Sequence, residues 1–285
     1  MKVDLKGGEI ILYSLRKSVA AFALMLLLFV TTSAKAATLT DEEYSRLKII
    51  FSDARIATMS DEDAQRYLSY DLENSNIVSK YYRVTKTTNG TTTTEVSEEE
   101  ATNATKNIAT RGVSYTTTYK NIQIASIPLN SANSYSIDLT TLWLKSPYIK
   151  SYDVIAMRTD DATVIEGSQE GTQSYIYSNG NVGYVYYSNN GTNMVKASNG
   201  FGISMNLVDA ANTYQCTIEA IVTATTKWAT VYGSYQHAAT NVTLAQSKSY
   251  TISHNGYGEV INFATAVQND YDGMQGVSIA LDYTA

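Results

Sequence analysis

Few side chains in this sequence could carry out acid–base or nucleophilic chemistry. The chain has two histidines, His237 and His254. Neither belongs to an H-E-x-x-H motif, and no G-x-S-x-G nucleophile elbow occurs, although the members of a catalytic triad need not be close in sequence. Both histidines have polar, turn-forming neighbours, which predicts solvent-facing loop positions. No catalytic residue is therefore assigned.

Carboxylates are the second possible source of chemistry. A glycoside hydrolase needs two of them facing each other across a cleft. The sequence alone does not indicate which carboxylates converge, so a carbohydrate-active hydrolase remains an alternative function. The candidates are Asp153, Glu166, Glu170, Glu219 and Glu259.

One acidic segment resembles the start of a calcium-binding loop. Residues 269–273 read Asn-Asp-Tyr-Asp-Gly, with alternating oxygen ligands and a glycine, but the bidentate Glu of an EF-hand is missing. A polar hairpin turn explains the same residues. Clustered zinc ligands and phosphate-binding glycine loops are also missing from the sequence. We therefore expect no metal and no cofactor.

The single cysteine, Cys216, lies in an alternating run with Ile218, Ala220 and Val222 on the same side. This pattern favours a buried structural thiol over a nucleophile. One cysteine also excludes an intramolecular disulfide.

Tyrosines interleaved with Asn and Gly could stack on sugars. They occur in segments 175–180 and 184–191. The alternative is that tyrosine suits half-buried strands, with its hydroxyl in water. The ligand-binding residues remain unassigned.

The N-terminus reads as a cleavable signal peptide over residues 1–36. Arg16 and Lys17 precede an apolar run from Val19 to Val30, and Ala34 and Ala36 have the small-residue spacing of a cleavage site. The run has 12 residues, whereas a membrane-spanning helix needs about 20. We expect cleavage near Ala36–Ala37, a secreted or extracellular protein, and no transmembrane anchor after cleavage.

Charge restricts the partners. Cleavage would remove five of the 21 basic and two of the 27 acidic side chains, which lowers the net charge from −6 to −9. This net charge argues against nucleic acids and anionic membranes as partners, because phosphate binding needs clustered Lys and Arg. A surface glycan or a protein is the expected partner, and the oligomeric state is unknown.

Residues 38–73 are predicted to be helical. Thr40 and Glu43 form a capping box, and Ser60 with Asp63 marks a second helix start. The acidic residues around them are therefore interpreted as helix caps rather than catalytic groups. A hairpin is predicted next, with its turn at Asn89-Gly90, and a short helix from Ser97. For residues 85–111, a Thr-rich linker is the alternative to hairpin plus helix.

From Val113 onward the chain is rich in short alternating segments separated by Asn-Gly turns. This pattern predicts a mainly β fold, an antiparallel β-sandwich or jelly-roll-like domain preceded by a small helical or α+β segment. Trp143 and Trp228 are expected in its core. The predicted domains are a signal peptide (1–36), an N-terminal segment (37–111) and a β-sandwich (112–285). The strand candidates are 113–126, 134–144, 151–158, 173–178, 182–188, 201–207, 214–225, 229–236, 248–253, 258–268 and 275–284.

The leader and three segments resemble uncharacterised secreted proteins of clostridial and related Gram-positive bacteria. These segments are residues 59–63, 67–71 and 143–155. The resemblance covers mainly residues 1–160. It implies an exported bacterial protein of unassigned role and carries over no functional residues.

Together these features predict a secreted, non-enzymatic protein that acts in extracellular binding or surface assembly. A pore-forming β-toxin is an alternative, because residues 113–119 alternate as an amphipathic membrane hairpin would. An outer-membrane barrel is less consistent with the many short strands, since barrel strands need about 9–11 residues.

Overall fold

The computed structural model describes residues 37–87, 90–106, 116–253 and 260–284. These described residues belong to one compact unit. The predicted signal peptide lies outside the described residues, and so does the predicted boundary at 111–112. The strands on either side of that boundary, β1 (Asn76–Thr87) and β3 (Thr116–Pro128), are paired in one sheet.

Three short helices occupy the predicted helical region: α2 (Asp41–Leu47), α3 (Asp53–Ala57) and α4 (Asp61–Leu68). The capping box of Thr40 and Glu43 is confirmed. The helical region has a start that the sequence analysis did not identify, because the Ser52 hydroxyl accepts the Arg55 N–H and begins α3. Ser60 caps α4 in the same way.

The apolar sides of these helices form a separate small core. Leu47, Phe51 and Met59 are fully or almost fully buried and pack with Ala125 and Ile127 of β3. The helices are thereby fixed to the sheet face that carries these two residues.

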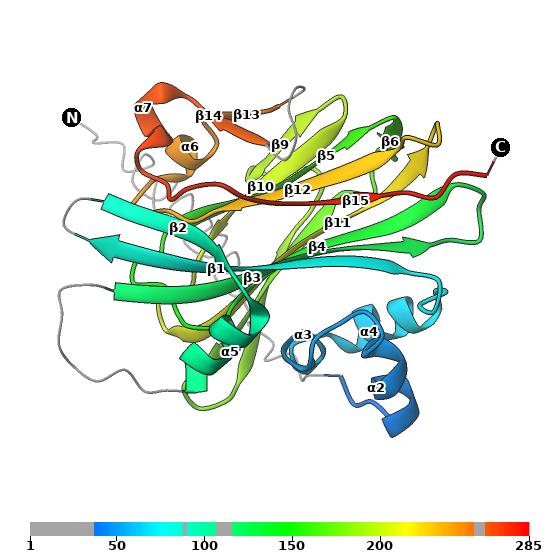
Figure 1. Cartoon of the computed structure of the whole chain (residues 1–285), viewed down its shortest axis with the longest axis horizontal. Helices are drawn as coiled ribbons and strands as arrows, with labels where there is room; N and C mark the ends of the chain where they lie inside the picture. Colours follow the sequence, from blue (N-terminus) through cyan, green and yellow to red (C-terminus); the bar gives the residue numbers. More distant parts are fainter. Residues whose placement is uncertain (1–36, 88–89, 107–115, 254–259, 285) are drawn as a thin grey trace, which may run out of the picture. The chain divides into compact units, whose positions relative to one another are not determined.

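An antiparallel eight-stranded sheet forms one layer (Figure 1). Its order is β2-β1-β3-β4-β11-β7-β8, with β6 paired to β11. The predicted hairpin is confirmed by the register of β1 with β2, and the predicted helix after it is α5 (Glu98–Lys106). The remaining strands are β2 (Gly90–Val96), β4 (Ser134–Trp143), β6 (Ala162–Val164), β7 (Glu170–Tyr177), β8 (Val182–Tyr187) and β11 (Ala211–Ala224).

A five-stranded sheet, in the order β15-β12-β5-β10-β9, packs against the inner face of the first. Alternation places Trp143, Ile218 and Cys216 of the large sheet in one core with Phe201 and Tyr235 of the small sheet. The mainly β, sandwich-like fold class is therefore confirmed. The small sheet consists of β5 (Tyr152–Asp160), β9 (Met194–Ala197), β10 (Gly200–Asn206), β12 (Thr230–Gln236) and β15 (Gln275–Ala280).

The C-terminal region adds elements that periodicity did not predict. Residues 258–268 were expected to be one strand, but their described part forms a three-residue strand followed by a helical turn. These elements pack on the outer face of the small sheet, on Val154 and Ala156. They are α6 (Leu244–Ser247), β13 (Tyr250–Ile252), β14 (Ile261–Phe263) and α7 (Thr265–Gln268).

The two tryptophans have opposite environments. Trp143 is 1% exposed, as predicted, whereas Trp228 is 70% exposed, so its predicted core position is wrong. Trp228 lies in the loop between β11 and β12, and the Lys227 ammonium lies 5.0 Å from the centre of its ring.

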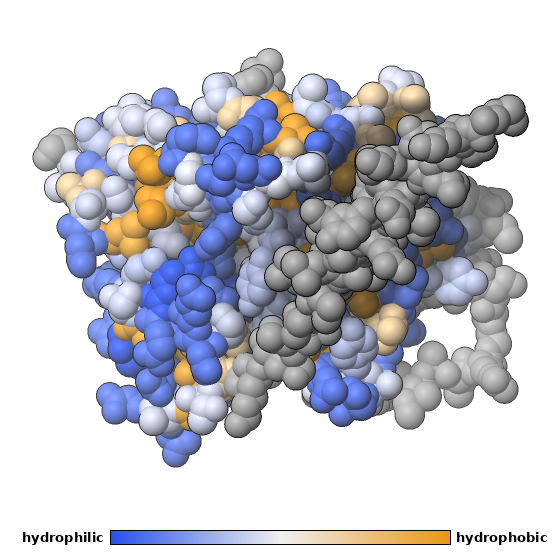
Figure 2. Space-filling model, turned by 180° about the vertical axis from the view of Figure 1, so that it is seen from behind, coloured by the Kyte–Doolittle hydropathy of each residue, from blue (hydrophilic) through white to orange (hydrophobic). Residues whose placement is uncertain are grey.

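On the face seen in Figure 2, hydrophilic residues dominate the described surface, and apolar residues form smaller areas among them. Within the described parts of the chain, no helix has the length and apolarity needed to cross a membrane.

Candidate functional site

The outer face of the large sheet carries a row of three carboxylates. Asp138 of β4, Glu219 of β11 and Glu170 of β7 are direct cross-strand neighbours. Adjacent like charges in a sheet repel each other. The row therefore needs positive partners, and the N-terminal helices supply them.

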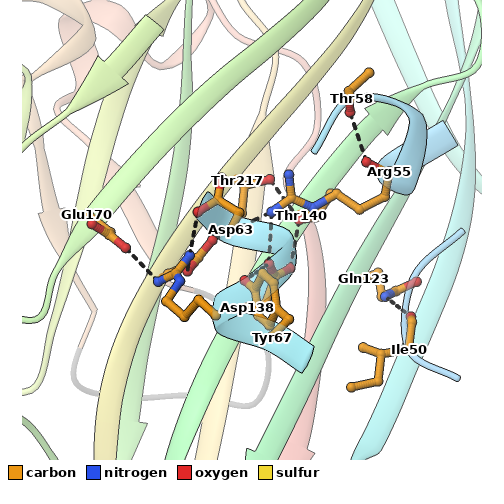
Figure 3. A network of polar contacts seen from close by, with 12 residues as sticks. Ile50, Arg55, Thr58, Asp63, Tyr67, Gln123, Asp138, Thr140, Glu170 and Thr217 are labelled. Atoms are coloured by element: carbon orange, nitrogen blue, oxygen red, sulfur yellow. Dashed lines mark hydrogen bonds and ion pairs between the residues drawn. The ribbon is translucent and has the colours of Figure 1, made fainter. Parts of the chain in front are cut away.

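Arg55 of α3 and Tyr67 of α4 converge on Asp138 (Figure 3). The Tyr67 hydroxyl donates to Oδ2 of Asp138 at 2.8 Å, and Nη2 of Arg55 lies 3.4 Å from the same oxygen. Thr140 donates to the other carboxylate oxygen at 2.7 Å. Arg55 is 4% exposed and Asp138 is fully buried, so each charge depends on the other for compensation.

Arg66 of α4 joins the rest of the row to the helix. Its guanidinium lies 2.8 Å from Asp63, 2.8 Å from Glu170 and 2.6 Å from Glu219. Burial raises the pKa of Glu219 to about 7, with a further contribution from Asp138, against the opposing effect of Arg66. This charged cluster fixes α4 against β7 and β11.

A groove of about 400 Å³ begins where the charged cluster ends. One side is the start of α4, and the other consists of β7, β8 and the residue after β8. Asp63, Arg66 and Glu170 belong both to the cluster and to the groove wall, whereas Glu219 does not line the groove. The lining residues are Ser60, Glu62, Asp63, Arg66, Glu170, Gly171, Thr172, Tyr186, Tyr187 and Ser188.

Tyr186 presents an aromatic ring at this groove. It is 63% exposed and stacks on Tyr184, with ring centroids 5.9 Å apart and an angle of 12° between the planes. Burial, followed by the charges of Asp63 and Glu62, raises the pKa of Tyr186. The phenol therefore stays neutral at physiological pH and can donate a hydrogen bond.

The other tyrosines considered for sugar stacking differ from Tyr186. Tyr175 is 7% exposed, and its ring lies against Gly183 and Tyr177 on the inner side of the sheet. Tyr187 is also buried. The accessible ring, that of Tyr186, therefore comes from the segment 184–191.

A second polar cluster lies between the sheets and contains His237. The prediction that this histidine faces solvent is wrong, because it is 5% exposed and its Nδ1 lies 2.8 Å from Oδ1 of Asp153. Asp153 also accepts the Ala238 N–H at 2.9 Å and the Tyr235 hydroxyl. The second predicted loop histidine, His254, lies outside the described residues.

Lys120 extends this second cluster. Its ammonium is 1% exposed, lies 2.8 Å from Asp272 and is 4.8 Å from the centre of the Trp143 ring. Asp272 also accepts the backbone N–H of His237 at 2.8 Å. The Lys120 ammonium and the His237 backbone N–H thus donate to the two carboxylate oxygens of Asp272. A calcium ion could bind this carboxylate only by displacing these donors.

The other residues that the sequence analysis considered for metal binding or catalysis lie apart from one another. Asp270 accepts the Thr240 hydroxyl at 3.1 Å, and in the part of the chain that the structure describes, no three His, Cys, Asp or Glu residues are grouped to hold a metal. Glu166 pairs with Lys196 at the surface. Glu259 lies outside the described residues. Cys216 is fully buried, as predicted, and burial raises its pKa well above the ordinary value.

The five carboxylates proposed for a hydrolase are thus only partly brought together. Glu170 and Glu219 meet on Arg66, while Asp153 belongs to the histidine cluster. The sequence did not indicate Arg55, Arg66 or Asp138. Arg55 and Arg66 lie in the last turns of helices that begin with acidic residues, and this position was the available signal for the two arginines. The same position is equally consistent with stabilisation of the helix dipole.

No protein-family model matches the chain, and no curated protein sequence matches it. One similar solved structure is the enzymatically active domain of tailspike protein 4 from bacteriophage CBA120. It is 9% identical over 55% of this chain and 19% of that chain, with a TM-score of 0.22. Another, described as a pore forming protein, is 8% identical over 57% of this chain and 83% of that chain, also with a TM-score of 0.22. Similarity at this TM-score supports no inference about function.

Proposed function

We propose that this is an extracellular glycan-binding protein that holds a sugar in the groove between α4 and β8. The observation that carries the proposal is the exposed Tyr186 ring, stacked on Tyr184, beside a groove whose polar wall includes Glu62, Arg66 and Glu170. A ligand site typically combines an apolar surface with a few well-placed polar groups.

The groove chemistry suits hydroxyl-bearing ligands. The carboxylates accept hydrogen bonds from hydroxyl groups, and the ring of Tyr186 offers its face to the apolar side of a sugar. Arg66 is held by Asp63, Glu170 and Glu219, so this wall is preorganised before a ligand arrives. Three acidic side chains and one arginine line the groove, which favours neutral over acidic glycans.

The extracellular location remains part of the proposal. It is supported by the arginine-lysine pair, the apolar run and the small residues of the leader. Secretion of the protein into the medium, with an N-terminus at or near residue 37, is the direct measurement.

The geometry favours binding over hydrolysis at this groove. Two carboxylates would have to face a glycosidic bond from opposite sides. Glu170 and Glu219 are cross-strand neighbours on one face, and Arg66 contacts both. Glu219 is 6% exposed and lies outside the groove lining.

The pore-forming alternative has less support. Residues 113–115 lie outside the described residues, and Thr116 to Tyr119 form the start of β3, paired with β1. In a pore-former these strands would have to leave the sheet. Leakage of dye-loaded liposomes on addition of the protein would support that alternative.

Glycan-array binding, followed by calorimetry with the strongest neutral oligosaccharide, tests the proposal. Tyr186→Ala should weaken binding at least about tenfold, which corresponds to about 1.4 kcal/mol. Trp228→Ala is the matched control, because Trp228 is similarly exposed but lies in another loop. Absence of glycan binding, or equal affinities of the two variants, would contradict the proposal.

A further inference from the structure

His237 lines a small cavity of about 20 Å³ that is separate from the glycan groove. Its volume is sufficient for about one water molecule. The walls come from β1, β3 and the loop after β4, and they are largely apolar: Val84, Pro147, Tyr148 and Ile149 line it together with Thr118 and Lys86. His237 is therefore a buried base beside a water-sized space.

The hydrogen bonds of Asp153 define which nitrogen of His237 is available. Asp153 also accepts hydrogen bonds from the Tyr235 hydroxyl and the Ala238 N–H. An ionised carboxylate can only accept hydrogen bonds, so the Nδ1 atom of His237 that contacts Asp153 must carry the proton. The neutral ring then has its lone pair on Nε2. No described residue hydrogen-bonds Nε2, while His237 lines the cavity.

Lys86 supplies a positive charge at the same cavity. Its ammonium donates to the Ala239 carbonyl at 2.8 Å and lies 5.9 Å from the centre of the Tyr148 ring. None of the described carboxylates forms an ion pair with it. Lys86, Thr91 and Ala239 also line a neighbouring groove of about 800 Å³, which offers room for a larger group next to the cavity.

We propose that Asp153 and His237 form a general-base dyad that hydrolyses a small ester bound in the neighbouring groove. Nε2 of His237 removes a proton from a water molecule while the water oxygen bonds to the ester carbonyl carbon. The tetrahedral intermediate then breaks its bond to the alkoxide oxygen, and the alkoxide takes the proton back from Nε2. The products are one carboxylic acid and one alcohol, and the base is regenerated.

Each part of the cavity has a role in this reaction. Asp153 orients the imidazole and stabilises its protonated form, and Lys86 stabilises the negative charge that develops on the carbonyl oxygen. The cavity holds the attacking water, and the ester lies in the neighbouring groove of about 800 Å³, which shares Lys86, Thr91 and Ala239 with the cavity. This activity is independent of the glycan groove, so either proposal can fail without the other.

Hydrolysis of p-nitrophenyl acetate by the purified protein tests the dyad. His237→Asn keeps an N–H donor near the position of Nδ1 but lacks Nε2, so kcat/KM should fall at least about 100-fold.

A second pair of variants keeps the test valid if His237→Asn does not fold. Lys86→Met should lower kcat about 100-fold, as loss of an oxyanion-stabilising donor does. Lys227→Met is the matched control, because Lys227 also lies over an aromatic ring but far along the chain, in the Trp228 loop. No ester turnover above the uncatalysed rate, or unchanged kcat in Lys86→Met, would overturn the proposal.

Discussion

At Glu219, two electrostatic effects act in opposite directions. The carboxyl group is buried, which favours its protonated form, while Arg66 and Arg55 favour the ionised form. Burial has the larger effect, and it places the pKa at about 7 instead of the usual value of 4.5. Glu219 therefore changes its charge in the middle of the physiological pH range, next to the residues that hold α4.

The raised pKa predicts how stability depends on pH. A group whose pKa is raised on folding stabilises the protein below its unfolded pKa, and this contribution is lost as pH rises through the folded pKa. Glu219→Gln cannot ionise, so its stability relative to wild type should increase by about 1–3 kcal/mol between pH 5 and pH 8. Urea unfolding at both pH values measures the difference.

Glu166→Gln is the control for this experiment. Glu166 lies at the surface, and its hydrogen bond and ion pair with Lys196 lower its pKa. It is therefore ionised throughout the range from pH 5 to pH 8, and its substitution should give a nearly constant difference. A difference for Glu219→Gln that does not change with pH would show that Glu219 titrates normally.

At the scale of elements, short helices with strong caps position the groove. α4 has eight residues, which is marginal for a helix on its own. The Ser60 hydroxyl accepts the Asp63 N–H at 3.1 Å, and Tyr67 and Arg66 attach the helix to the sheet. Cap and sheet contacts together fix the side of the groove that carries Glu62 and Arg66.

Removal of this cap should cost stability. Ser60→Ala leaves the Asp63 N–H without its acceptor and is expected to lower the free energy of unfolding by about 1 kcal/mol. Ser60→Thr retains a hydroxyl in the same place and should restore most of the loss. Equal stabilities of the alanine and threonine variants in urea unfolding would mean that the cap contributes little.

The elements that the sequence predicted are those with local signals. The capping box at Thr40, the hairpin of β1 and β2 and the alternation around Cys216 depend on neighbours a few residues away. The charged cluster had no such signal, since Arg55 and Asp138 are 83 residues apart and Tyr67 and Asp138 are 71 apart. His237 was misplaced for the same reason, because its polar neighbours in the sequence concealed a partner 84 residues away.

At the scale of the whole molecule, stability depends on how closely the two sheets approach each other. With a single cysteine, the compact unit has no internal disulfide, so the core between the sheets must supply the stabilisation. Gly233 of β12 lies opposite Leu139 of β4 in this core. A Cβ atom at Gly233 would lie 2.4 Å from Cδ1 of Leu139, which is closer than two carbon atoms can pack.

A methyl group at this position should therefore separate the sheets or force Leu139 into a poor rotamer. Gly233→Ala is expected to lower the free energy of unfolding by about 1–3 kcal/mol, although alanine suits strands better than glycine. Gly273→Ala is the control, because its Cβ would meet Thr93 at an ordinary distance of 3.6 Å. If contact with Leu139 is the cause, Gly233→Ala should cost clearly less in a Leu139→Ala background, and a double-mutant cycle by urea unfolding measures this coupling. Additive effects would instead mean that the sheets already leave room at Gly233, and that Leu139 and Gly233 stabilise the sandwich independently.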